Sequence, residues 1–244
     1  MEKSEKREEL SANEIIDINQ EMADRPISLE SVLYLVSWAK QKFDDKLFAD
    51  TSLGKDSALM WDAVAKSGED ITVTFGDTQL MPPETYELRD TFTNMYPMDL
   101  AVAYPDPEEF DEIVSQKLWR SRNRQDLDRF LSVVKLEPLR QLDQRLGKRA
   151  TLAAARSDQT LDREGLDYVV EQKDGTYRVY PFLEWPKQQV DEYIDSQDLP
   201  RNRLAALYGL GAVSYRNIVY YENNVEVVNF DSCGRNSPDD KPVH

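Results

Sequence analysis

Short apolar runs alternate with amphipathic segments along most of the chain. The runs KLFAD, ITVTFG, DLAVAY and TYRVYPF have the length and apolar content of buried β-strands. Segments between them, such as SALMWDAVAKS and PPETYELRDTFTNMY, carry apolar residues at helical spacing. Ser28 and Gly68 stand where helices would begin and end. This alternation predicts an α/β fold with a mostly parallel sheet and helices on both faces.

The two ends of the chain differ from this pattern. Residues 1–25 are polar and charged, which predicts a frayed arm or a loosely docked helix. Residues 26–222 carry the alternating segments, and the chain of 244 residues is long enough for one α/β domain with a sizeable core. Residues 223–244 end in NSPDDKPVH and predict a mobile tail.

Charge and composition exclude several classes of partner. The formal net charge of −16 disfavours non-specific binding to nucleic acid and to anionic membranes. No apolar stretch approaches the roughly 20 residues that span a bilayer, and the start, MEKSEKREEL, does not resemble a secretory signal. A single cysteine cannot form an intramolecular disulfide. We therefore expect a protein of the reducing cytoplasm.

The stretch FADTSLGKDSALM, residues 48–60, joins the first predicted strand to a helix. Gly54 permits a close approach of the backbone, and the following amides and the helix N-terminus would form a cradle for an anion. Lys55 adds a point charge, and Ser52 and Ser57 add hydroxyl donors. The Walker pattern G-x-x-x-x-G-K-[ST] is absent, so this is not a Walker P-loop. The pattern indicates phosphate binding, and the alternative is an ordinary strand-to-helix turn with a solvated lysine.

Several blocks of the sequence resemble one protein family. TSLGKDSALM resembles the S-x-G-x-D-S loop of the adenine-nucleotide pyrophosphate-loop (PP-loop) proteins. Five further blocks resemble the phosphoadenylyl-sulfate (PAPS) reductases and keep their order: FGDTQLMPPETYELRD, VVKLEPLRQL, AARSDQT, YPFLEWPKQQVDEYI and LPRNRLAALYGLGAVSYRN. The blocks run from Ala49 to Arg216. The resemblance implies an adenine nucleotide alpha-hydrolase-like fold, with a five- to six-stranded sheet that holds a nucleotide over the loop.

The resemblance also implies which residues bind the substrate. Loop residues would hold phosphate or sulfate oxygens, two residues after the second strand would lie against the nucleotide, and two cations would bind its remaining anionic groups. These expected residues are Ser52, Gly54, Lys55, Asp56, Ser57, Asp77, Thr78, Lys135 and Arg156. Without the resemblance, Lys135 reads as a surface helix residue and Arg156 as a solvated loop residue. Ala154 and Ser157 replace a glycine and an arginine of the family pattern, which removes one ligand for an anionic group.

The only cysteine, Cys233, lies in DSCGRN near the end of the chain. PAPS reductases carry E-C-G-x-H there, on a segment that folds over the nucleotide. The resemblance implies that the Cys233 thiolate attacks the sulfate sulfur and that thioredoxin or glutaredoxin then releases sulfite. Ser232 and Asn236 replace the glutamate and the histidine of the family motif, while the neighbouring Arg235 would favour the thiolate. The alternative is an inert cysteine on a disordered tail.

Three functions remain open at this point. The first is a PAPS reductase, a thioredoxin-dependent oxidoreductase of sulfate assimilation. It would need no bound cofactor and no iron–sulfur cluster, because paired cysteine ligands are absent, and a homodimer stays open. The second is a PP-loop ATP enzyme that transfers an adenylyl group, since SLGKDS is closer to the ATP-using loop; only this enzyme would need Mg²⁺, held by Asp56 or Asp77. The third is a nucleotide-binding module without catalysis.

Overall fold

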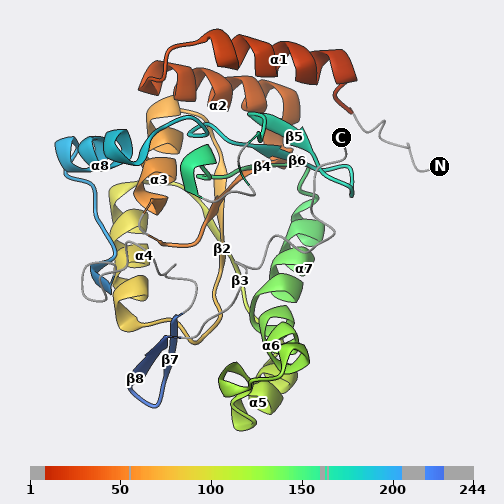
Figure 1. Ribbon diagram of the computed structural model, residues 1–244, viewed down its shortest axis with the longest axis vertical. Helices are drawn as coiled ribbons and strands as arrows, with labels where there is room; N and C mark the ends of the chain where they lie inside the picture. The colour runs from red at the N-terminus through yellow and green to blue at the C-terminus, as the bar shows by residue number, and fades with distance from the viewer. Residues whose placement is uncertain (1–8, 55, 160–162, 164, 205–217, 228–244) are drawn as a thin grey trace.

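The computed structural model describes residues 9–54, 56–159, 163, 165–204 and 218–227 (Figure 1). A six-stranded sheet with the order β3-β2-β1-β4-β6-β5 forms its centre. All neighbouring strands are parallel except β5, which pairs antiparallel with β6 at one edge. The strands are β1 (Leu47–Thr51), β2 (Thr72–Gly76), β3 (Leu100–Ala103), β4 (Ala150–Leu152), β5 (Val169–Glu171) and β6 (Tyr177–Val179). The predicted fold class is confirmed, although β5 was not predicted.

Helices cover both faces of this sheet, as the alternation of segments requires (Figure 1). Helices α2 and α3 pack against β1 on one face, and α7 packs against β2 and β3 on the other. Ser28 caps α2 and Gly68, in the left-handed conformation, ends α3, both as predicted. The α-helices are α1 (Ala12–Asp24), α2 (Leu29–Phe43), α3 (Ser57–Ser67), α4 (Pro83–Met95), α5 (Pro107–Ser115), α6 (Arg124–Leu131), α7 (Glu137–Leu146) and α8 (Lys187–Ser196).

Helix α3 is the most enclosed of the described helices. Its residues from Ser57 to Val64 are all buried, and Trp61 stacks on Phe92 of α4 with ring centroids 5.4 Å apart. Asp62 is buried as well, and it pairs with Lys66 at 2.8 Å and accepts hydrogen bonds from the hydroxyls of Tyr96 and Tyr193. Because α3 is closely packed along its first two turns, the loop that leads into its N-terminus ends at a rigid element.

Helix α1 lies within residues 1–25, the segment predicted to be a frayed arm or a loosely docked helix. Helix α1 begins with a capping box of Ser11 and Glu14, and its Ile18 and Met22 are each only 2% exposed within the main core. These two residues lie four apart on one helix face, so burying them docks α1 against the domain. The helix therefore belongs to the domain, in spite of its polar composition.

The predicted start of the tail at residue 223 cuts through a β-hairpin. Strands β7 (Ile218–Tyr221) and β8 (Asn224–Val227) pair antiparallel. Val219 packs into a small second core with Leu80 and Trp119, and Glu226 accepts hydrogen bonds from Trp119 Nε1 at 3.0 Å and Arg120 Nε at 2.9 Å. The remainder of the predicted tail, with Cys233, lies outside the described residues. None of the described helices has the length and apolar composition needed to cross a membrane.

Candidate functional site

The residues predicted to bind a nucleotide follow three neighbouring strands. The loop 52–56 follows β1, Asp77 and Thr78 follow β2, and Arg156 follows β4, and these strands lie side by side in the order β2-β1-β4. Because the three strands are parallel, their carboxyl ends meet at one edge of the sheet. The chain adds β2 and β3 on one side of β1 and then places β4 on the other side. α/β sheets bind ligands at such a switch point, here between β1 and β4.

The loop after β1 has a constrained backbone. Leu53 has φ = 53°, a left-handed conformation that side chains disfavour. Its side chain is fully buried, its N–H donates to Thr51 Oγ1 at 3.2 Å, and its carbonyl accepts from Asn202 Nδ2 at 3.2 Å. Strain of this kind persists only where the surrounding contacts impose it, and it is often found at functional sites.

Helix α3 starts directly after this loop and directs its positive end toward the edge of the sheet. Asp56 occupies the N-cap position but makes no side-chain capping bond to the helix. Ser57 N–H donates to the Gly54 carbonyl at 3.2 Å, which closes a tight first turn. The structure thus contains the predicted loop-to-helix arrangement, while Lys55 lies outside the described residues and its role stays a prediction.

The structure brings Asp56 and Arg156 into direct contact. Arg156 Nη1 lies 2.6 Å from Asp56 Oδ2, and Arg156 Nε lies 2.9 Å from Asp158 Oδ1. Gln159 Nε2 also donates to Asp56 Oδ2 at 3.0 Å, and Arg156 is only 2% exposed. Arg156 is therefore not a solvated loop residue, and two carboxylates compensate its charge. The ion pair ties the loop after β4 to the loop after β1; binding of an anionic group by Arg156 stays a prediction.

Asp77 and Thr78 organise the turn after β2. Asp77 is 4% exposed, and its Oδ1 accepts hydrogen bonds from the Gln79 N–H and the Tyr86 hydroxyl, both at 2.8 Å. Thr78 Oγ1 accepts from the Leu80 N–H at 3.2 Å. Burial, and then the Asp77 carboxylate, raise the pKa of the Tyr86 hydroxyl, so Tyr86 remains a donor at neutral pH. Tyr86 was not among the predicted site residues, although it lies in the block FGDTQLMPPETYELRD.

Lys135 is half-buried in a π-helical turn, Ser132–Leu136, between α6 and α7. Pro138 accounts for the widened turn, because it lacks an N–H and its ring crowds the carbonyl four residues earlier. Leu139 then packs so closely on Gly76, at the end of β2, that a Cβ there would lie 3.1 Å from it. The turn is thus attached to the sheet near Asp77, and contact between Lys135 and a nucleotide stays a prediction.

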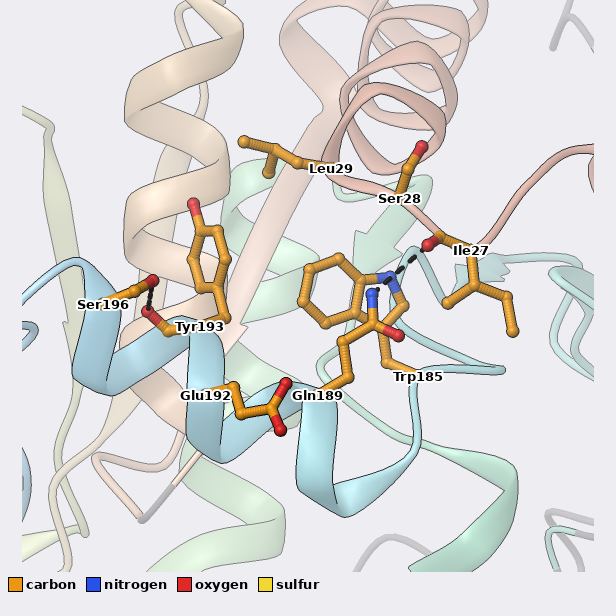
Figure 2. Close-up of a pocket in the computed structure, with 8 residues that line it drawn as sticks. All are labelled: Ile27, Ser28, Leu29, Trp185, Gln189, Glu192, Tyr193 and Ser196. Atoms are coloured by element: carbon orange, nitrogen blue, oxygen red, sulfur yellow. Dashed lines mark hydrogen bonds between the residues drawn. The ribbon is translucent and has the colours of Figure 1, made fainter.

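A pocket of about 440 Å³ lies away from these residues, between the start of α2 and α8 (Figure 2). Gln189 Nε2 donates across it to the Ile27 carbonyl at 3.2 Å. The Tyr193 hydroxyl already donates a hydrogen bond to the buried Asp62. Burial raises the pKa of the Tyr193 hydroxyl. The pocket is lined by Ile27, Ser28, Leu29, Trp185, Gln189, Glu192, Tyr193 and Ser196, none of which was predicted as a site residue.

The sheet, its strand order and the loop-to-helix connection at its carboxyl edge define an α/β protein of the adenine nucleotide alpha-hydrolase-like (PP-loop) class. Residues 46–220 match the family described as the phosphoadenosine phosphosulfate reductase domain. This match covers more than half of the chain, and the chain belongs to this family.

Individual relatives agree with this assignment. A phosphoadenosine 5′-phosphosulfate reductase from Synechococcus sp. is 30% identical over 192 residues, 78% of this chain and 80% of that protein. An adenosine 5′-phosphosulfate reductase from Halalkalibacterium halodurans is 28% identical over 194 residues, 78% of this chain and 81% of that protein. A crystal structure of the Candida auris PAPS reductase, a phosphate complex, is 26% identical with a TM-score of 0.68, covering 82% of this chain and 93% of that one.

Removing the Tyr86 hydroxyl tests whether Asp77 belongs to the site. In Tyr86→Phe, Asp77 keeps the Gln79 N–H but loses its second donor. A hydrogen bond to a charged group contributes roughly 1.5–3 kcal/mol, so if this bond positions Asp77 for binding, adenine-nucleotide affinity should fall about 10- to 100-fold in calorimetry. Tyr220→Phe is the matched control, because the Tyr220 hydroxyl bonds only the exposed Asn223 among the described residues. Equal affinities in both variants would remove Asp77 from the site.

Proposed function

We propose that this protein reduces 3′-phosphoadenylyl sulfate to sulfite and adenosine 3′,5′-bisphosphate, with Cys233 as the nucleophile. The observation that carries the proposal is the family match over residues 46–220, which encloses the loop, the Asp77 turn and Arg156. The curated relatives with this match are named as reductases of sulfated adenine nucleotides, and the matches extend over about 80% of their length. The Cys-Gly pair near the end of the chain supplies the sulfur that such a reaction needs.

The proposed reaction has two steps. The Cys233 thiolate attacks the sulfate sulfur, an S–S bond forms, the S–O bond to the nucleotide phosphate breaks, and adenosine 3′,5′-bisphosphate leaves with the bonding electrons. A thiolate of thioredoxin or glutaredoxin then attacks Cys233 Sγ and sulfite leaves; the second thiol of the reductant restores the Cys233 thiolate as the reductant becomes a disulfide. Electrons come from this dithiol, and the two proposed steps use no metal and no iron–sulfur cluster. The free thiol fits a reducing compartment such as the cytoplasm.

The chain's own residues bind and orient the nucleotide in this proposal. The loop 52–57 and the N-terminus of α3 take phosphate or sulfate oxygens, which develop charge as the S–O bond breaks. Asp77, held by Tyr86, borders the nucleotide. The pair of Asp56 and Arg156 keeps the loop after β1 against the loop after β4.

Calorimetry with separate nucleotides tests the proposal directly. The wild-type protein should bind PAPS and adenosine 3′,5′-bisphosphate, and PAPS with a thioredoxin system should yield sulfite. Adenosine 5′-phosphosulfate is a necessary parallel titration, because relatives are named for either substrate. Binding of ATP with Mg²⁺, with release of pyrophosphate and no sulfite from PAPS, would contradict the reductase and support the adenylylating alternative.

Lys55→Ala should weaken nucleotide binding without lowering the melting temperature. A charge-assisted contact contributes roughly 1.5–3 kcal/mol, so the dissociation constant for adenosine 3′,5′-bisphosphate should rise about 10- to 100-fold. Lys173→Ala, at an exposed turn between β5 and β6, is the control for loss of one positive charge. If both lysine variants bind as the wild type does, Lys55 is a solvated residue and does not bind the anion.

A further inference from the structure

Asn202 lies far from the loop in sequence but contacts its backbone. It belongs to the segment that follows α8 and is 2% exposed. Its Nδ2 donates to the Leu53 carbonyl at 3.2 Å, and its Oδ1 accepts from the Leu204 N–H at 3.0 Å. The donor and the acceptor of this buried side-chain amide are thus both hydrogen-bonded, the donor to the loop and the acceptor to the segment that carries Asn202. A buried amide with both ends satisfied holds its position strongly.

The segment that carries Asn202 is itself anchored. Leu199 N–H donates to the Ile194 carbonyl at the end of α8 at 3.0 Å, and Arg201 pairs with Asp195 at 2.8 Å. Helix α8 is attached to α3 through Tyr193 and the buried Asp62. Asn202 therefore holds the loop from a segment that is attached, through α8, to α3. This is the helix that directly follows the loop.

A bond to the Leu53 carbonyl also sets the direction of the next amide. The Leu53 carbonyl and the Gly54 N–H belong to one planar trans peptide, in which C=O and N–H point in opposite directions. When Asn202 fixes the carbonyl, the Gly54 N–H must point to the other side. Leu53 resists rotation at the same time, because its side chain is buried and its own N–H is bonded to Thr51.

We propose that Asn202 is a positioning residue for anion binding, which aims the Gly54 N–H into the phosphate cradle by holding the Leu53 carbonyl. The inference rests on the proposed nucleotide site and adds a residue that acts through the loop without touching the ligand. The structure offers a matched comparison in Asn19. Its side chain makes the same two kinds of backbone bond, to the carbonyl and the N–H of Val169, but it joins α1 to β5.

Two variants of Asn202 separate loss of the bond from added charge. Asn202→Asp keeps the acceptor for the Leu204 N–H but places a carboxylate against the Leu53 carbonyl. Asn202→Ala removes the donor without adding charge. Both should raise the dissociation constant for adenosine 3′,5′-bisphosphate by about 10- to 100-fold near pH 8, the cost expected for losing a buried hydrogen bond. Asn19→Asp should bind the nucleotide as the wild type does, whatever its effect on the melting temperature.

The pH profile gives a readout that a general loss of stability would not produce. Burial raises the pKa of an introduced carboxyl, and its protonated form donates a hydrogen bond again. Relative to the wild type at each pH, Asn202→Asp should recover most of its affinity by about pH 5.5, while Asn202→Ala should not. Amide hydrogen exchange at residues 52–57, measured without nucleotide, should speed up in Asn202→Ala and stay unchanged in Asn19→Asp.

The outcomes distinguish the inference from the function on which it rests. A wild-type protein that binds no adenine nucleotide would overturn both. If the wild type binds but Asn202→Ala binds equally well, only the inference is overturned; a defect confined to Asn202→Asp would then be a charge effect. Equal losses in Asn202→Ala and Asn19→Asp would mean that the residue contributes to general stability alone.

Discussion

Replacement of Cys233 by serine should abolish sulfite formation and leave nucleotide binding unchanged. A serine hydroxyl is far less ionised than a thiol at neutral pH, and it cannot accept and release the sulfonate by thiol exchange. The expected residual rate is below about one thousandth of the wild-type rate, the scale seen when a nucleophile is removed. The measurement is sulfite release from PAPS with thioredoxin supplied, since without a reductant a working enzyme stops after one turnover.

Cys233 is the only cysteine of the chain, so a thiol-specific reagent can serve as a second test of its role. Alkylation of the wild-type thiol must act through this residue, and it should reproduce the serine variant. Ser237→Ala, four residues further along, controls for a change in the same segment. Without reductant, PAPS should transfer one sulfonate group to the wild-type protein and none to Cys233→Ser, as measured by mass spectrometry.

Full turnover by Cys233→Ser would show that the cysteine is not the nucleophile. Release of pyrophosphate from ATP by both proteins would then favour the adenylylating enzyme. If neither protein converts either nucleotide, the non-catalytic binding module becomes the better explanation. Ser232 and Asn236, which replace the glutamate and histidine of the family motif, make this experiment the one that decides catalytic competence.

Replacement of Arg156 by alanine should produce the largest loss of stability among single changes at the site. It leaves Asp56, whose side chain is 12% exposed, without its ion-pair partner, and it also removes a partner of Asp158. Breaking a buried ion pair from one side costs about 3–5 kcal/mol, and we expect the lower end because Asp158 is 39% exposed. The free energy of unfolding, measured in urea at constant m-value, should fall accordingly.

Arg129→Ala is the matched control for this prediction. Arg129 pairs with Glu112 at 2.6 Å, but both side chains are 49% exposed, so its removal should cost no more than about 1 kcal/mol. The double variant of Arg156 and Asp56 should be less destabilised than the sum of the single variants, because the two groups are coupled. A loss for Arg156→Ala as small as that for Arg129→Ala would contradict the buried pair.

The same Arg156 variant also tests the role predicted from sequence. If Arg156 reads the 3′-phosphate, the affinity for PAPS should fall more than the affinity for ATP, measured where the variant is still folded. Equal reductions for both nucleotides would indicate that Arg156 acts only through the position of Asp56 and the loop.

Local patterns in the sequence determined the fold class, the order of most strands and helices, and the position of the loop-to-helix connection after β1. Burial on both faces of a parallel sheet requires continuous apolar strands, and helices of this size require an amphipathic repeat, so both features are visible within single segments. Helix ends such as Ser28 and Gly68 were predictable for the same reason, because capping depends on a few neighbouring residues. The blocks shared with the reductase family are likewise short and continuous, and they indicated the family.

Only the tertiary structure decided which polar residues pair across the site. Arg156 and Asp56 lie 100 residues apart, Asn202 and Leu53 lie 149 apart, and Asn19 and Val169 lie 150 apart. No local pattern encodes such pairs, because each depends on which strand ends and helices the chain brings together. The docking of α1 was hidden for the same reason: a mostly polar helix packs on the core through a few apolar residues once a complementary surface exists. Arg156, a candidate phosphate ligand, is thus also half of a buried ion pair. Its partner Asp56 comes from the loop after β1, whereas its second carboxylate, Asp158, lies in the same loop as Arg156.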